Sequence, residues 1–158
     1  MAGKTHSYYA ELTWTGNLGP GTVDYRSYSR EHVASAGDKQ PIAGSSDPAF
    51  RGHPERWNPE ELLVVSLSQC HMLWYLDLAA RAGVVVTAYT DSPTGTMVEE
   101  ASGAGQFSEV TLRPRVVVAE VAMVEKARAL HETTHALCFI ARSVNFDVIH
   151  EPEIVVAS

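Results

Sequence analysis

The segment from Asn58 to about Arg81 constrains the fold of this chain more than any other part of the sequence. It opens with Asn58–Glu61, in which an asparagine can cap a helix, a proline suits the first turn and two carboxylates complement the positive end of the helix dipole. The residues that follow are apolar on most sides, and Gly83 is a typical residue for ending a helix. The sequence therefore predicts a long, buried, central helix.

The rest of the chain alternates strand signals with one further helical segment. Residues 121–142 combine apolar and charged side chains in a pattern that predicts a second long helix. The connection over residues 34–57 is rich in Gly, Pro, Ser and Asp, and a loop of that length is often functional. This order favours an α+β fold in a single domain of residues 1–158. The predicted strands are residues 5–14, 22–33, 41–43, 84–89, 95–98, 107–118, 144–148 and 154–156.

Composition limits the classes of partner. The chain has 158 residues, 45% of them hydrophobic and 20% charged, which suits one globular domain with a substantial core. A net charge of -7 argues against a general nucleic-acid surface. No run of 18 or more uninterrupted apolar residues predicts a membrane span, and the first residues lead into no secretory apolar core. We therefore expect a soluble, cytoplasmic protein that binds neither nucleic acid nor membrane.

The chain has two cysteines, Cys70 and Cys138, and each falls inside a predicted helix. Their residue type allows three roles: packing as small core residues, binding a metal, or acting as a redox pair. A reactive thiolate needs a lowered pKa, and neither cysteine stands at a helix N-terminus, where the dipole would lower it. A nucleophilic cysteine here would need a guanidinium from elsewhere in the fold, oriented by a carboxylate.

Two further functions stay open on the residues alone. His131, His135 and Cys138 have the spacing i, i+4 and i+7, which places them on one face of a helix, and Cys70–His71 could complete a zinc site. The more specific CxxC motif is absent from the sequence. Alternatively, the chain could be a non-catalytic module that binds a small ligand in an apolar pocket, with both cysteines buried.

Two sequence motifs resemble a known family. The run Asn58–Leu63 is followed by Cys70, ten residues after its first glutamate, and Cys138 is followed by Phe139-Ile140 and then Ser143. These features resemble the OsmC/Ohr family of osmotically inducible and organic hydroperoxide resistance proteins, and in particular its OsmC-like branch. The resemblance implies antiparallel sheets wrapped around two long central helices, and an intertwined homodimer.

The resemblance also implies a reaction. In such a protein Cys70 would attack an organic hydroperoxide and become a sulfenic acid, and Cys138 would condense with it to a disulfide. An external dithiol, which in the Ohr branch is a lipoylated protein, would restore both thiols. The implied activity is that of a cysteine-based peroxidase that uses no metal and no other cofactor.

The supporting residues follow from the same resemblance. Glu60 matches the motif carboxylate, so it would orient the activating arginine. That arginine is either Arg51, in the loop position of the OsmC branch, or Arg30, nearer the position of the Ohr branch; we favour Arg51 for its spacing and its Phe-Arg-Gly context. Arg30, His71 and Trp74 are predicted to contact the substrate. His71 and Trp74 also depart from the small or apolar neighbours that are typical of the family.

Overall fold

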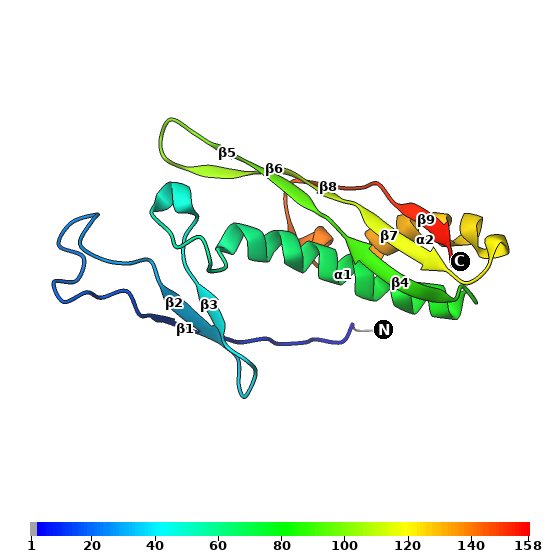
Figure 1. The fold of residues 1–158 in the computed structure, drawn as a ribbon, viewed down its shortest axis with the longest axis horizontal. Coiled ribbons are helices and arrows are strands. Elements are labelled where there is room, and N and C mark those ends of the chain that lie inside the picture. Colours follow the sequence, from blue (N-terminus) through cyan, green and yellow to red (C-terminus); the bar gives the residue numbers. More distant parts are fainter. Residues whose placement is uncertain (1–2) are drawn as a thin grey trace. The chain divides into compact units, whose positions relative to one another are not determined.

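The computed structural model describes residues 3–158 and divides into two compact units, which meet between Leu62 and Leu63 in the sequence (Figure 1). The first unit contains a small antiparallel sheet in the order β1-β2-β3 and one 3₁₀ turn. The single domain over residues 1–158 stays a prediction. The elements of this unit are β1 (Glu11–Trp14), β2 (His32–Ser35), β3 (Ile42–Gly44) and η1 (Pro48–Phe50).

The predicted hairpin of β1 and β2 is confirmed, but its strands are shorter than expected and its loop is longer. The loop spans residues 15–31, so the strand predicted over residues 22–33 is wrong for most of its length. The side-chain oxygen of Asn17 explains part of this, because it accepts hydrogen bonds from the backbone of Gly19 at 2.9 Å and of Gly21 at 3.1 Å. Such a side-chain turn offers the backbone an alternative to pairing in a sheet.

The second unit contains two three-stranded sheets and most of the helical structure. Helix α1 (Pro59–Arg81) begins in the first unit and continues into the second, as predicted, and Gly83 follows it at φ +73°. The sheet orders are β4-β7-β9 and β5-β6-β8. The remaining elements are β4 (Val86–Asp91), β5 (Thr94–Glu99), β6 (Gly105–Leu112), β7 (Pro114–Val118), η2 (Val121–Met123), α2 (Val124–Leu137), η3 (Ala141–Ser143), β8 (Asp147–His150) and β9 (Glu153–Val156).

The α+β class is confirmed, and the pairing of the strands is mixed. Antiparallel pairs join β4 to β7 and β5 to β6, whereas β8 pairs parallel to β6 and β9 pairs parallel to β7. The segment predicted as one strand over residues 107–118 is two strands, β6 and β7, that part at Arg113. The backbone N–H of Arg113 donates to the carboxylate of Asp91 at 2.7 Å, so this N–H is not available for pairing with a neighbouring strand.

Helix α1 packs against the sheets on one face only. Its buried residues Leu67, His71, Tyr75 and Ala79 recur every four positions, and in Figure 1 the helix runs beneath β4 and β7. The expectation of a helix buried on all sides is therefore wrong for the single chain: Leu73 is 63% exposed. Two hydrophobic clusters form the core of this unit, one of Tyr75, Ala79, Val84, Val116, Val118, Ala127 and Ile154, and one of Leu67, Val110 and Leu112.

Within residues 3–158, α1 is the one helix long and apolar enough to cross a membrane by length and composition. Its buried face nevertheless contains polar groups that bind other elements of the same unit. The hydroxyl of Tyr75 donates to the backbone carbonyl of Ala127 at 3.0 Å, and His71 is hydrogen-bonded to His131. These bonds are typical of a core helix in a globular unit.

Helix α2 is shorter than the segment predicted over residues 121–142. It ends at Leu137, and Cys138 caps it with an extended backbone at φ -62° and ψ 113°. The hydroxyl of Thr134 donates to the carbonyl of Leu130 at 2.8 Å, a back-bond that weakens the helix near its end. The prediction that Cys138 lies inside the second helix is therefore wrong by one residue.

Candidate functional site

The structure brings the two cysteines together. Cys70 is half-buried in the middle of α1, and Cys138 is buried just beyond the end of α2. Both thiols are free, and they lie close enough for Cys70 to raise the pKa of the Cys138 thiol. Residues that are 68 positions apart in the sequence therefore form one thiol pair, between the middle of α1 and the end of α2.

Cys138 is held as a protonated thiol. Burial, reinforced by the neighbouring Cys70 thiol, raises the pKa of Cys138 to about 11. The backbone N–H of Ala141 points at the sulfur from 3.5 Å and opposes this rise, but burial prevails. At neutral pH Cys138 is therefore an S–H group that can donate to the sulfur of Cys70, and it is a poor first nucleophile.

The predicted arginine and glutamate lie in the other unit, which ends at Leu62. Arg51 follows η1 in the left-handed region, at φ 64°, and its guanidinium is 6.0 Å from the ring centre of Tyr25. Glu60 is half-buried in the first turn of α1. The arrangement of Arg51, Glu60 and Cys70 as a triad stays a prediction.

At the start of α1 the two adjacent glutamates, Glu60 and Glu61, have different roles. The backbone N–H of Asn58 donates to the carboxylate of Glu61 at 3.2 Å, and the N–H of Glu61 donates to the Asn58 side chain at 2.8 Å. This reciprocal pair is a capping box. Because Glu61 caps the helix, the carboxylate of Glu60 is available, and it forms no ion pair within residues 3–158.

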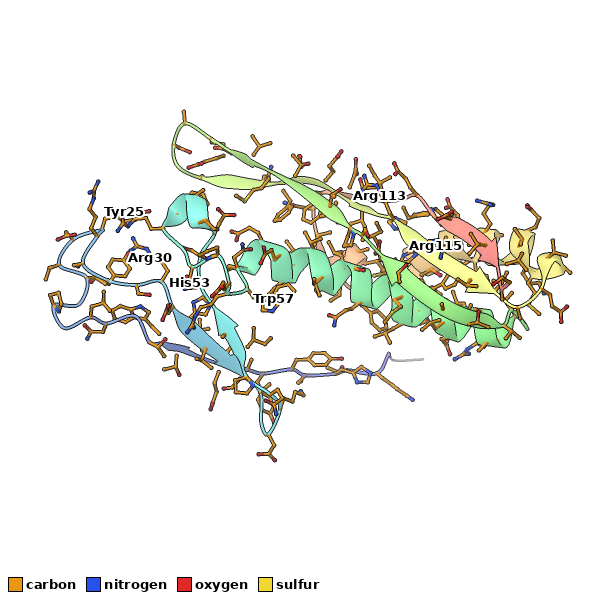
Figure 2. All side chains as sticks on the ribbon, in the orientation of Figure 1. Tyr25, Arg30, His53, Trp57, Arg113 and Arg115 are labelled. Carbon is orange, nitrogen blue, oxygen red and sulfur yellow. The ribbon has the colours of Figure 1, made fainter. Side chains whose placement is uncertain are left out.

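The alternative arginine, Arg30, is held by its own loop. Its guanidinium donates to the carbonyls of Tyr28 at 2.7 Å and Tyr25 at 2.6 Å, and it lies 4.1 Å and 4.4 Å from the centres of the same two rings. Figure 2 shows Arg30 beside Tyr25 in the first unit. Carbonyl and aromatic partners therefore occupy Arg30, whereas no hydrogen bond or ion pair engages the Arg51 side chain in the described part of the chain.

A buried histidine pair joins α1 to α2, and the sequence did not predict it. Nε2 of His71 lies 2.9 Å from Nδ1 of His131, both residues are 1% exposed, and the rings are stacked. Burial, reinforced by neighbouring groups with His150 among them, lowers the pKa of His71 to about 4 and that of His131 to about 3. Both imidazoles are therefore neutral at pH 7. His71 lies in the core of the second unit, and its predicted contact with the substrate stays a prediction.

The zinc arrangement considered from the spacing does not form. Within residues 3–158, no three or more His, Cys, Asp or Glu side chains are placed to hold a metal ion. The i+7 position fails because α2 ends at Leu137, so Cys138 leaves the helical face that carries His131 and His135. Nδ1 of His131 is also occupied by His71.

Trp74 lies one turn after Cys70 on α1 and borders a hollow of about 300 Å³. The Trp74 ring contacts Phe139 edge to face, with 5.3 Å between ring centres. Phe139 itself follows Cys138, so aromatic side chains flank the thiol pair from α1 and from the segment after α2. The lining of this hollow is Leu73, Trp74, Asp77 and Arg81. The substrate contact predicted for Trp74 stays a prediction.

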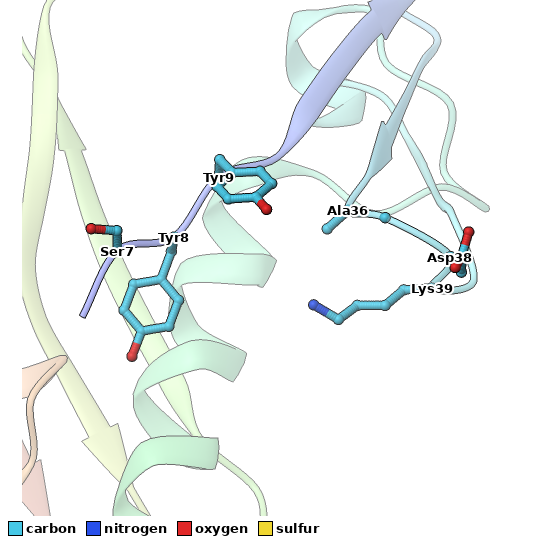
Figure 3. Close-up of a pocket in the computed structure, with 7 residues that line it drawn as sticks. Ser7, Tyr8, Tyr9, Ala36, Asp38 and Lys39 are labelled. Carbon is cyan, nitrogen blue, oxygen red and sulfur yellow. The ribbon is translucent and has the colours of Figure 1, made fainter.

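A separate hollow of about 570 Å³ lies in the first unit, between the segment before β1 and the turn that joins β2 to β3 (Figure 3). Tyr8 and Tyr9 form one side of it and Lys39 extends from the other. It contains neither of the predicted arginines and none of the thiols.

Comparison with known proteins identifies the family. The family model for OsmC-like proteins matches residues 52–152. The chain is similar to the solved structure of an OsmC-like protein of unknown function from Vibrio cholerae, with 30% identity, a TM-score of 0.83, and coverage of 94% of this chain and 99% of the other. No match was found among curated proteins.

Two more distant structures share the fold. One is an organic hydroperoxide resistance protein from Elizabethkingia anophelis, with 17% identity, a TM-score of 0.68, and coverage of 98% of this chain and 100% of the other. The second is a putative organic hydroperoxide resistance protein from Vibrio cholerae with captopril bound in one of its active sites, with 20% identity, a TM-score of 0.62, and coverage of 95% and 93%. Together with the family match over residues 52–152, the fold and the 30% identical relative show that this chain belongs to the OsmC-like protein family.

Proposed function

We propose that this chain is a thiol-dependent peroxidase that reduces organic hydroperoxides. The observation that carries the proposal is the proximity of Cys70 and Cys138, because a peroxidatic thiol and a resolving thiol must lie together to close a disulfide. The names of two relatives support the substrate class, since both are described as organic hydroperoxide resistance proteins.

The two sulfurs divide the reaction between them. The Cys70 thiolate attacks one peroxide oxygen, the O–O bond breaks, and the alkoxide leaves as an alcohol after taking a proton, so Cys70 becomes a sulfenic acid. Cys138, held protonated in the ground state, then attacks the Cys70 sulfur, and a disulfide forms with release of water. An external dithiol, for example that of a lipoylated protein, reduces the disulfide and is itself oxidised to a disulfide.

Thiol counting tests this proposal. The reduced chain is mixed with an equimolar amount of cumene hydroperoxide or of hydrogen peroxide, and free thiols are titrated under denaturing conditions. We expect both thiols per chain to disappear with cumene hydroperoxide, and to do so faster than with hydrogen peroxide. If two thiols per chain survive an excess of the organic peroxide, the redox cycle is wrong and the non-catalytic binding module becomes the better explanation.

We further propose that Arg51, oriented by Glu60, activates Cys70. The freedom of the Arg51 side chain and the occupation of Arg30 by Tyr25 and Tyr28 support this choice. Arg51→Ala is expected to raise the Cys70 thiol pKa and to slow peroxide reduction about tenfold or more, because a charge-assisted contact is lost. The measurement is the pH dependence of the alkylation rate in a Cys138→Ser background.

Arg30→Ala is the matched comparison for Arg51→Ala. It is expected to loosen the loop before β2, with little change in the Cys70 thiol pKa, because its guanidinium binds that loop. Arg51→Lys should restore part of the rate if charge is what matters, and less of it if the planar guanidinium is needed. An unchanged thiol pKa in Arg51→Ala, with a raised one in Arg30→Ala, would transfer the role to Arg30.

We also propose that the protein is a homodimer that works in the cytoplasm. A second copy would cover the outer face of α1 and the segment after α2, where Leu73 is 63% exposed and Phe139 is 66% exposed. A reducing cytoplasm would keep the two thiols free between turnovers.

Sedimentation tests the dimer. The chain is expected to sediment as a dimer at micromolar concentration, and Leu73→Glu is expected to shift it to the monomer, because a charge would be buried in an apolar interface. Lys39→Glu, on the turn between β2 and β3, is the control and should leave the dimer intact. A monomeric wild-type chain would contradict the proposal.

A further inference from the structure

A second candidate site lies on the side of α2 that faces the end of β8. It is a hollow of about 470 Å³ that shares no lining residue with the hollow beside Trp74 and includes neither cysteine. All its residues belong to the second unit. The lining consists of Arg128, Ala129, His131, Glu132, His150, Glu151 and Pro152.

One buried ring nitrogen at this hollow has no partner. His131 is 1% exposed and uses Nδ1 for the bond to His71, while its Nε2 is buried and meets no hydrogen-bonding group within residues 3–158. Buried polar atoms are nearly always paired with protein, water or a ligand. Because His131 also lines the hollow, a molecule bound there can supply the missing partner.

The tautomer of His131 decides what that partner must be. The pair has two neutral arrangements; in one of them Nε2–H of His71 donates to Nδ1 of His131, and Nε2 of His131 then carries the hydrogen and is a donor. The missing partner of Nε2–H is then a hydrogen-bond acceptor. Water is one acceptor, and the oxygen of an anion is another.

The charges around the hollow favour an anion. Arg128 precedes His131 by three positions on α2, so the two share one side of the helix, and Arg128 forms no ion pair within residues 3–158. A free guanidinium next to an N–H donor is suited to a carboxylate or a phosphate.

The two carboxylates of the lining are already engaged. Glu132 contacts Nε2 of His150 at 3.2 Å, and Glu151 pairs with Arg113 at 3.3 Å. Figure 2 labels Arg113, which lies between β6 and β7. The charge of Glu151 is therefore balanced by Arg113, whereas the contact of Glu132 balances charge only when His150 is protonated, and Arg128 has no carboxylate partner within residues 3–158.

We propose that this hollow binds a small oxyanion, with the guanidinium of Arg128 pairing its charge and Nε2–H of His131 donating a hydrogen bond to one of its oxygens. The binding does not depend on the peroxidase proposal, since neither thiol takes part. The positive charge comes from Arg128 alone, so the site binds at neutral pH.

Calorimetric titration of the full-length chain tests the proposal. Inorganic phosphate and acetate are titrated separately at pH 7.5 and constant ionic strength, and the ¹⁵N resonances of the imidazoles are followed in parallel. We expect saturable binding of one anion per chain, a shift of the His131 resonance, and an affinity about tenfold weaker in Arg128→Gln. Tighter binding of phosphate would identify a phosphate site, and tighter binding of acetate a carboxylate site.

Arg142→Gln is the matched control, because Arg142 is an exposed arginine just after α2 that lies outside the hollow. It should leave the affinity unchanged. Arg128 is exposed, so its replacement does not threaten the fold, and His131→Gln then tests the donor separately. The proposal is overturned if neither anion gives saturable binding at millimolar concentration, or if Arg142→Gln weakens binding as much as Arg128→Gln does.

Discussion

Cys70→Ser is expected to abolish the consumption of organic hydroperoxide, whereas Cys138→Ser is expected to complete one turnover and stop. A serine hydroxyl is not ionised at neutral pH, so the variant lacks the nucleophile that breaks the O–O bond. The conservative change removes only one sulfur from a half-buried position, so the fold should be retained. Peroxide loss is followed by a colorimetric assay, with excess dithiol for Cys70→Ser and without added dithiol for Cys138→Ser, because a free thiol would itself reduce the sulfenic acid.

The Cys138→Ser variant separates the two proposed roles. Without a resolving thiol, Cys70 should stop as a sulfenic acid, which a dimedone probe traps and mass spectrometry assigns to the peptide. Circular dichroism of both variants confirms that they fold. The assignment of roles fails if Cys70→Ser still consumes peroxide at the wild-type rate, or if dimedone labels Cys138 in place of Cys70.

Acidification from pH 7 to pH 5 is expected to lower the free energy of unfolding by about 4 kcal/mol, roughly 2 kcal/mol for each of His71 and His131. In the folded chain the pKa is about 4 for His71 and about 3 for His131, whereas a histidine in the unfolded chain has a pKa of about 6.5. The unfolded state therefore binds more protons in this window, and stability falls as the pH falls. Urea denaturation at both pH values measures the difference.

The pair of variants His71→Gln and His131→Gln provides the comparison for acid stability. Each removes one titrating ring, so each should remove about half of the loss between pH 7 and pH 5, even if the variant is less stable at pH 7. His53→Gln, at an exposed position in the first unit, should keep the full wild-type dependence. Equal pH dependence in all four proteins would show that other groups cause it.

Local signals near α1 allowed much of the fold to be predicted. The capping residues at Asn58 and Glu61 act within four positions, and Gly83 acts at the other end, so both helix limits could be read from short sequence windows. The end of α2 was harder to place. No glycine or proline marks it, and the back-bond of Thr134 to Leu130 has no clear sequence signature.

Contacts between distant segments could be predicted only in part from the sequence. The pairing of Cys70 with Cys138 could be expected because a family resemblance supplied it, not because the spacing did. The bond between His71 and His131 had no such support, since it joins residues 60 positions apart and each histidine alone fits several roles. The parallel pairing of β8 with β6 and of β9 with β7 is equally non-local, and alternating hydrophobicity does not distinguish it from antiparallel pairing.

The position of Cys138 beyond the end of α2 determines how much of the backbone must change when the disulfide forms and is reduced. Cys138 stands beyond the last helical residue, and its N–H still bonds to the carbonyls of Thr134 and His135. Rotation about its Cα–Cβ bond moves the sulfur and leaves these backbone bonds in place, so oxidation can proceed with α2 intact and reduction need not refold it.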